Sequence, residues 1–192
     1  SDLAMKSPSP RSRPTRSLVI HLLTIALMGV SVVSMYATLR LGQAHGNDFK
    51  HLWAGARMLA AGDNPYAVER LVRFALLNGW NDGAGRAIIN PYVYLPTTGL
   101  LMRPLAWLTY PRALTFWFVL NFLAAWGLVL AGPDLLRLER RALARLAGAA
   151  FLVAAFPFYR QMTAGQMNVV TAWLVLGAVA ALLRRRDLLA GA

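Results

Sequence analysis

The clearest structural signal in the chain is the run SLVIHLLTIALMGVSVVSMYATL, residues 17–39, which contains no Asp, Glu, Lys or Arg. As a helix with a rise of 1.5 Å per residue, these 23 residues extend about 35 Å, more than the roughly 30 Å of bilayer hydrocarbon. The run is too long for the apolar region of a signal peptide, and no A-x-A cleavage site follows it. It therefore predicts an uncleaved first transmembrane helix.

The composition agrees with a membrane protein. Of the 192 residues, 57% are apolar and 15% are charged, against roughly 25% charged in typical globular domains, and the mean hydropathy is +0.46. These values exclude a disordered chain and argue against an ordinary soluble enzyme. The absence of Cys excludes disulfides, thiolate catalysis and Cys-ligated metals.

The net charge of +12 would suggest nucleic acid as a partner in a soluble protein. Here the basic residues lie mostly between the apolar runs and at their ends, a distribution typical of the positive-inside rule. We therefore expect the lipid bilayer as a partner and no nucleic acid.

Three further spans are predicted at about 111–132, 143–160 and 167–184. The third is short, but Arg145 and Arg160 at its ends can extend to the two interfaces. The expected fold is an all-α multi-pass membrane protein, with a disordered basic tail at 1–16 and a membrane domain at 17–192. Because the chain stops at LLAGA directly after an Arg cluster, we expect it to be the N-terminal part of a larger protein.

The basic segments set the expected topology. The tail, the 133–145 connection and Arg184–Arg186 all fall on one side when four spans alternate, so we expect that side to be the cytoplasm. The long loop 40–110 then lies outside the cell (inner) membrane. A fifth span near 97–109 would move the last two basic clusters outside, and we reject it for that reason.

The outer loop is expected to hold three short helices. Asn47 is expected to cap the first, which begins at Asp48 and stops at Gly62. A second helix is expected from Asp63-Asn64-Pro65 to Asn78-Gly79, and a third at about 97–109. The first two are amphipathic, so we expect them to lie on the outer leaflet, with Trp53, Tyr66 and Trp80 at headgroup depth.

An ordered set of short motifs lies across this region: Asp48-Phe49, then GDNPY at 62–66, Tyr94-Leu95-Pro96, Pro104-Leu105 and GQMN at 165–168. In this order and on this topology the set resembles the N-terminal half of glycosyltransferase family 87, polyprenyl-phosphate-sugar-dependent enzymes of the GT-C superfamily. The resemblance covers about residues 46–170. It departs at Leu95, where the family pattern has Pro.

The resemblance implies a multi-span fold with the active site on the outer face of the membrane. It implies a lipid-linked sugar phosphate as donor, carrying a hexose (as in mannosyltransferases) or a pentose, and a glycolipid or glycan hydroxyl as acceptor. Asp48 matches the position of the family's catalytic carboxylate. No resident cofactor is implied, and dependence on a divalent metal is left open.

Glycosyl transfer with inversion needs one base to take the acceptor proton, and a single carboxylate meets that need. For Asp48 the alternative is a structural first-turn carboxylate favoured by the helix dipole. A lipid phosphate needs cationic or amide donors, so the candidate substrate contacts are Arg160, Gln166, Asn168 and Arg103. Tyr94 is the further candidate, as a residue that lines the site. The alternative for Arg160 is an arginine that extends to the membrane interface, and for Asn168 a helix cap. The alternative for Tyr94 is a place in the interfacial belt of aromatic residues.

A second class of function is a transporter or a non-catalytic membrane scaffold, and a fragment lacking further spans could also be inactive. Transporters place polar residues at mid-span, whereas the polar residues of this chain gather in the outer loops. That distribution favours a site at the membrane interface.

Overall fold

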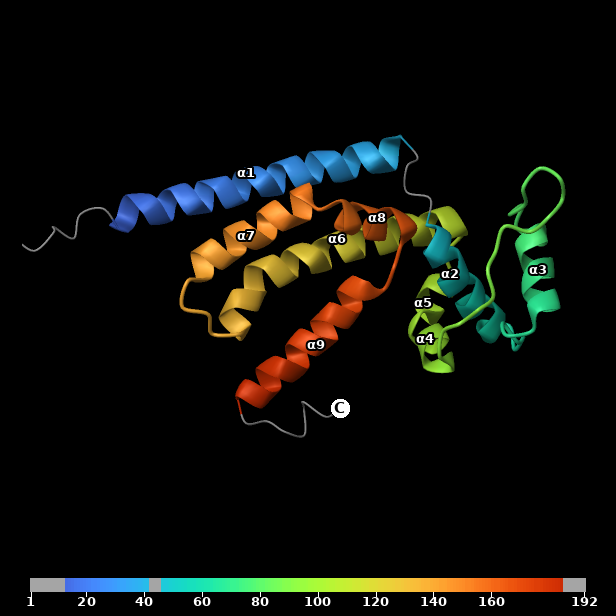
Figure 1. The fold of residues 1–192 in the computed structure, drawn as a ribbon. Coiled ribbons are helices and arrows are strands. Elements are labelled where there is room, and N and C mark those ends of the chain that lie inside the picture. The colour runs from blue at the N-terminus through green and yellow to red at the C-terminus, as the bar shows by residue number, and fades with distance from the viewer. Residues whose placement is uncertain (1–12, 42–45, 185–192) are drawn as a thin grey trace, which may run out of the picture. The chain divides into compact units, whose positions relative to one another are not determined.

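A computed structural model describes residues 13–41 and 46–184, and within these ranges the chain forms nine helices (Figure 1). They are α1 (Arg13–Arg40), α2 (Asn47–Ala60), α3 (Val68–Leu77), α4 (Pro96–Leu101), α5 (Arg103–Ala106), α6 (Tyr110–Leu135), α7 (Arg141–Ala154), α8 (Phe156–Ala164) and α9 (Asn168–Leu183). An isolated antiparallel bridge joins Asn81 and Ala87. For the described residues, the predicted all-α fold is confirmed.

The chain divides into two compact units, and each is described by itself. The first comprises the residues up to Tyr36, Ala125–Ala155 and the residues from Leu174. The second comprises Ala37–Ala124 and Phe156–Trp173. The boundaries fall inside α1, α6 and α9, so these helices contribute to both units.

Among the described helices, two are long and apolar enough to cross a membrane. They are Arg16–Arg40, with 25 residues, and Tyr110–Leu135, with 26, and they correspond to the first two predicted spans. α1 begins at Arg13, so its first residues belong to the segment expected to be disordered; residues 1–12 lie outside the described residues.

The predicted third span is not one straight helix. α7 ends at Ala154, the backbone of Ala155 is extended, and the helix axis turns by 61° between Arg141–Ala154 and Phe158–Ala164. Pro157 explains the break, because it has no N–H to donate to the carbonyl of Val153 in a continuous helix. α9 has 16 residues and falls below the length of a full span. The described helices thus supply two spans, or three if the bent pair counts as one, and the four-span count stays a prediction.

In the first unit α6 is the common packing partner. Trp126 of α6 donates from Nε1 to Oγ of Ser31 in α1, over 3.1 Å. Gly148 of α7 lies so close to α6 that an added Cβ would be 3.1 Å from Val129. Arg145 of α7 donates to the carbonyl of Leu130 and pairs with Asp134. A small residue therefore brings the two helices close, and a charged cluster joins their ends.

In the second unit α2 lies at the centre. Its buried residues include Phe49, Leu52 and Trp53, which pack with Met102, Leu105, Ala106, Ala113 and Trp117 from α5, α6 and the preceding turn. Trp53 is 3% exposed and donates from Nε1 to the carbonyl of Leu105 over 3.1 Å. Trp53 therefore packs against protein, and the position of α2 on the leaflet surface with Trp53 at headgroup depth stays a prediction.

Three helix boundaries in the outer loop also differ from the prediction. α2 begins at Asn47 and not after it, because Gly46, with a φ of 57°, takes the cap position without a side-chain hydrogen bond. α3 begins at Val68, because Asn64 Oδ1 accepts from the N–H of Tyr66 and closes a separate turn. The third helix is split into α4 and α5 at Met102, just before Pro104.

Candidate active site

Asp48 lies in the first turn of α2 and is half-buried. Its Oδ2 accepts a hydrogen bond of 2.8 Å from Nε2 of Gln166, which is 118 residues away in the sequence. The structure thereby brings together the first and the last of the motifs found in the sequence. A hydrogen bond to a carboxylate contributes about 1.5–3 kcal/mol, more than one between neutral groups.

The turn between α8 and α9 is packed directly on the first turn of α2. The N–H of Gly46 donates to the carbonyl of Thr163 over 2.9 Å, and Trp117 Nε1 donates to the carbonyl of Gly165 over 2.9 Å. Gly165 has a φ of +76°, and an added Cβ would lie 2.7 Å from Cβ of Phe49. Only glycine suits this position, both for its backbone conformation and for the space available.

The start of α2 is equally confined on its other side. Gly46 has a φ of +57°, and an added Cβ would lie 2.4 Å from Cδ1 of Leu114 and 2.8 Å from Oη of Tyr110. Tyr110 also donates from Oη to the carbonyl of Gly46 over 3.2 Å. The residues before and after Asp48 are therefore fixed by α6 and by the α8–α9 turn, so the carboxylate is built onto a rigid support.

Asn168, the first residue of α9, extends the contact by one step. Its Nδ2 donates to Oε1 of Gln166 over 2.9 Å. Of the predicted substrate contacts, Gln166 and Asn168 are thus joined to Asp48 by a continuous chain of hydrogen bonds.

Tyr94 also lies near the candidate carboxylate. Burial, and secondarily the negative charge of Asp48, raise the pKa of the Tyr94 phenol. Its backbone carbonyl accepts a 2.5 Å hydrogen bond from Oη of Tyr66, and its ring contacts that of Tyr92 at 5.6 Å between centroids. The GDNPY and Tyr94-Leu95-Pro96 motifs are therefore in contact in the fold. The charge of Asp48 contributes to the raised pKa of Tyr94.

The two arginines predicted as phosphate contacts are placed differently. Arg160, in α8, and Arg103, at the start of α5, are both exposed. In the described part of the chain no ion pair joins either of them to Asp48. Their role as substrate contacts stays a prediction.

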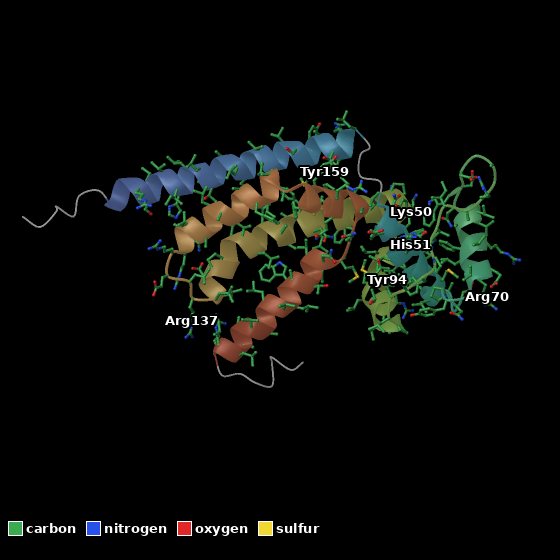
Figure 2. All side chains as sticks on the ribbon, in the orientation of Figure 1. Lys50, His51, Arg70, Tyr94, Arg137 and Tyr159 are labelled. Atoms are coloured by element: carbon green, nitrogen blue, oxygen red, sulfur yellow. The ribbon has the colours of Figure 1, made fainter. Side chains whose placement is uncertain are left out.

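A pocket beside α2 was not predicted from the sequence, and its lining includes Asn47, the residue before Asp48, but not Asp48 itself. The pocket has a volume of about 340 Å³ and is lined by Asn47, Lys50, His51, Asp82, Asn90 and residues 87–89. Figure 2 labels Lys50 and His51 on α2. Lys50 lies with Nζ 5.8 Å from the centroid of the Trp80 ring. Lys50 and His51 are two and three residues after Asp48, and the helical pattern of the sequence places both opposite the apolar stripe of that helix.

His51 is 8% exposed and is held in one tautomer. Its Nε2 accepts a 2.8 Å hydrogen bond from the backbone N–H of Asn90, and this requires Nε2 to be unprotonated. Burial lowers the pKa of His51, with a smaller contribution from the charge of Lys50, against the opposing charge of Asp48. A neutral His51 thus fastens the loop before Tyr94 onto α2.

Among the described residues, no three His, Asp or Glu side chains gather as a protein-held metal site requires. Hydrogen bonds join the carboxylate of Asp48 to the amides of Gln166 and Asn168, and Lys50 lines the pocket beside α2.

Comparison with known proteins places the chain in a family. The model of glycosyltransferase family 87 matches residues 92–192, which is 101 of 192 residues, and the chain belongs to that family. It is thus a membrane glycosyltransferase by family. No curated protein and no solved structure matches the chain.

The matched segment contains Tyr94, Arg103, Arg160, Gln166 and Asn168, and it begins after Asp48. The role of Asp48 accordingly depends on its motif and on its contact with Gln166.

Proposed function

We propose that this protein transfers a sugar from a polyprenyl-phosphate donor to a hydroxyl of a lipid or glycan on the outer face of the cell membrane, with Asp48 as the base. The N-terminus then lies in the cytoplasm, and the loop between α1 and α6 faces outward. The family supports glycosyl transfer in a membrane, and the positive-inside distribution supports the orientation.

One observation supports the role of Asp48 above the others. The carboxylate accepts a 2.8 Å hydrogen bond from Gln166, a residue inside the segment that matches the family. A plain first-turn carboxylate would gain from the helix dipole without such a partner. The amide instead joins Asp48 to a turn whose conformation requires glycine at position 165.

The proposed reaction is a displacement at the anomeric carbon. Asp48 accepts the proton of the acceptor hydroxyl while the hydroxyl oxygen forms a bond to that carbon. The bond from carbon to the phosphate oxygen breaks, and the lipid phosphate leaves with the electron pair. A phosphate is a good leaving group, so one carboxylate supplies the acid–base chemistry that the step requires.

Lys50 is our preferred contact for the leaving phosphate. It lines the pocket that adjoins the first turn of α2, whereas Arg103 and Arg160 are exposed and unpaired with Asp48. A lysine next to the departing oxygen compensates the charge that develops there. Tyr94 is proposed to line the acceptor side, because it lies near Asp48.

The test is Asp48→Asn in membranes that contain the full-length protein, supplied with a radiolabelled polyprenyl-phosphate sugar. Loss of a general base lowers the rate by about 10²–10⁴-fold. Glu69→Gln is the matched control, since Glu69 is also a first-turn carboxylate, in α3, and is exposed. Glu69→Gln is expected to keep wild-type transfer.

Wild-type transfer by Asp48→Asn at equal protein level would remove Asp48 from the mechanism. The other class of function, a transporter or a scaffold, predicts that the unmodified protein transfers no sugar from any polyprenyl-phosphate donor.

A further inference from the structure

We propose that Gln166 is a positioning residue that selects the reactive oxygen of Asp48, and that Asn168 fixes the orientation of the Gln166 amide. This inference rests on the proposed function, in which Asp48 is the base. It gives the two amides a role other than the substrate contact that their motif suggests.

The direction of the hydrogen bonds is determined by chemistry. An ionised carboxylate can only accept, so Gln166 must present its NH₂ group to Asp48. Its Oε1 then faces the other way and needs a donor, which Nδ2 of Asn168 supplies over 2.9 Å. Each amide therefore has one orientation that allows both hydrogen bonds, and this series of hydrogen bonds ends at Oδ2 of Asp48.

Occupation of Oδ2 has a consequence for the reaction. The hydrogen bond from Gln166 to Oδ2 fixes the plane of the Asp48 carboxylate. We therefore assign the other oxygen, Oδ1, as the atom that takes the proton of the acceptor hydroxyl. Misplacement of a catalytic group by about 1 Å can cost about 10²-fold in rate, so control of this plane matters for catalysis.

The support of Gln166 is rigid enough for this role. The N–H groups of Gly165 and Gln166 both donate to the carbonyl of Gln161, over 3.1 and 3.2 Å, and close the end of α8. Gly165 packs on Phe49, the residue that follows Asp48. The donor and the acceptor of the hydrogen bond are thus attached to backbones that are in direct contact.

The decisive experiment compares a truncation and an isosteric change at position 168. Asn168→Ala removes the donor to Oε1 but leaves the Gln166–Asp48 hydrogen bond possible. Asn168→Asp places an acceptor there, which competes for the NH₂ of Gln166 and turns Oε1 toward Asp48. We expect kcat to fall severalfold in Asn168→Ala and about 10²-fold in Asn168→Asp, with the KM of donor and acceptor unchanged.

Gln166→Leu and the double variant Gln166→Leu/Asn168→Asp complete the set. Gln166→Leu is expected to match the kcat loss of Asn168→Asp, again with unchanged KM. Because Asn168 acts through Gln166, adding Asn168→Asp to Gln166→Leu is expected to cause no further loss. Asn78→Asp, an exposed amide-to-acid change at the end of α3, controls for added charge and keeps wild-type kinetics.

A rise in KM with unchanged kcat would show that the amides bind substrate and would overturn the proposal. Equal losses in Asn168→Ala and Asn168→Asp would overturn the orienting role of Asn168, as would additive losses in the double variant. Asp48→Asn in the same series separates this result from failure of the proposed function, because full activity there contradicts the base itself whatever the Gln166 variants do.

Discussion

Gly165→Ala tests whether the α8–α9 turn and the start of α2 form one rigid support. Gly165 has a φ of +76°, a conformation that costs an L-residue about 1–2 kcal/mol. The new methyl group would also lie 2.7 Å from Cβ of Phe49, where ordinary contact begins at 3.4 Å. The two surfaces must therefore separate by about 0.7 Å (3.4 − 2.7).

The steric part of the stability lost in Gly165→Ala depends on how tightly Phe49 is packed. Phe49 is 0% exposed, and its ring lies 5.7 Å from that of Trp117, so it has little room to retreat. Overpacking of this kind costs about 1–3 kcal/mol in addition to the backbone strain. The same displacement, if it falls along the bond from Gln166 to Asp48, lengthens that bond from 2.8 Å to about 3.5 Å, beyond useful hydrogen-bond length.

The matched control is Gly62→Ala. Gly62 has a φ of +75°, and an added Cβ would meet nothing within 4 Å, so this variant carries the backbone strain alone. We expect Gly62→Ala to lose about 1–2 kcal/mol of stability and to keep its transfer activity. Gly165→Ala is expected to lose more stability and to transfer sugar up to about 10²-fold more slowly.

The assay measures thermal unfolding and sugar transfer on both variants in the same membranes. Equal stability of Gly165→Ala and Gly62→Ala, with wild-type transfer in both, would show that Phe49 yields easily and that the support of Asp48 is not rigid.

Two further predictions concern the pH dependence of stability and the orientation in the membrane. Burial lowers the pKa of His51 from its ordinary value of 6.5, so the stability that His51 contributes is complete above about pH 6.5 and declines as the pH falls below that value. His51→Gln is expected to flatten this decline in thermal unfolding measured from pH 7 to pH 5, and an unchanged slope would refute the assignment. The chain has no Cys, so an exposed Ala84→Cys gives a single label site, which an impermeant maleimide should reach from outside intact cells; labelling only after lysis would contradict the orientation.

Much of the local structure could be predicted from the residues alone. The apolar runs predicted α1 and α6, because a span needs only length and the absence of charge. Gly62 and Gly79, with φ values of +75° and +73°, follow the ends of α2 and α3 as expected, because glycine readily adopts the left-handed conformation. These features depend on neighbours within a few residues.

The burial of α2 could not be predicted in the same way. Lys50, His51 and Arg57 give the helix a polar face that is typical of a membrane surface. In the fold, the N–H of Asn90 donates to His51, which is buried, and the carbonyl of Ala106 accepts from Arg57, which stays exposed. Polar atoms of His51 and Arg57, which in the sequence indicate contact with solvent, are thus hydrogen-bonded to the backbone of a later part of the loop.

The amino-acid sequence by itself determined a helical membrane protein, the motifs of its family and a carboxylate at the start of the second helix, since periodicity, charge and spacing are local properties. Tertiary structure alone decided that Gln166 bonds to Asp48, that Asn168 bonds to Gln166, and that Lys50 and His51 line a pocket beside α2. The physical reason is that a hydrogen bond between residues 118 positions apart depends on how the chain packs, here through two glycines in left-handed conformation.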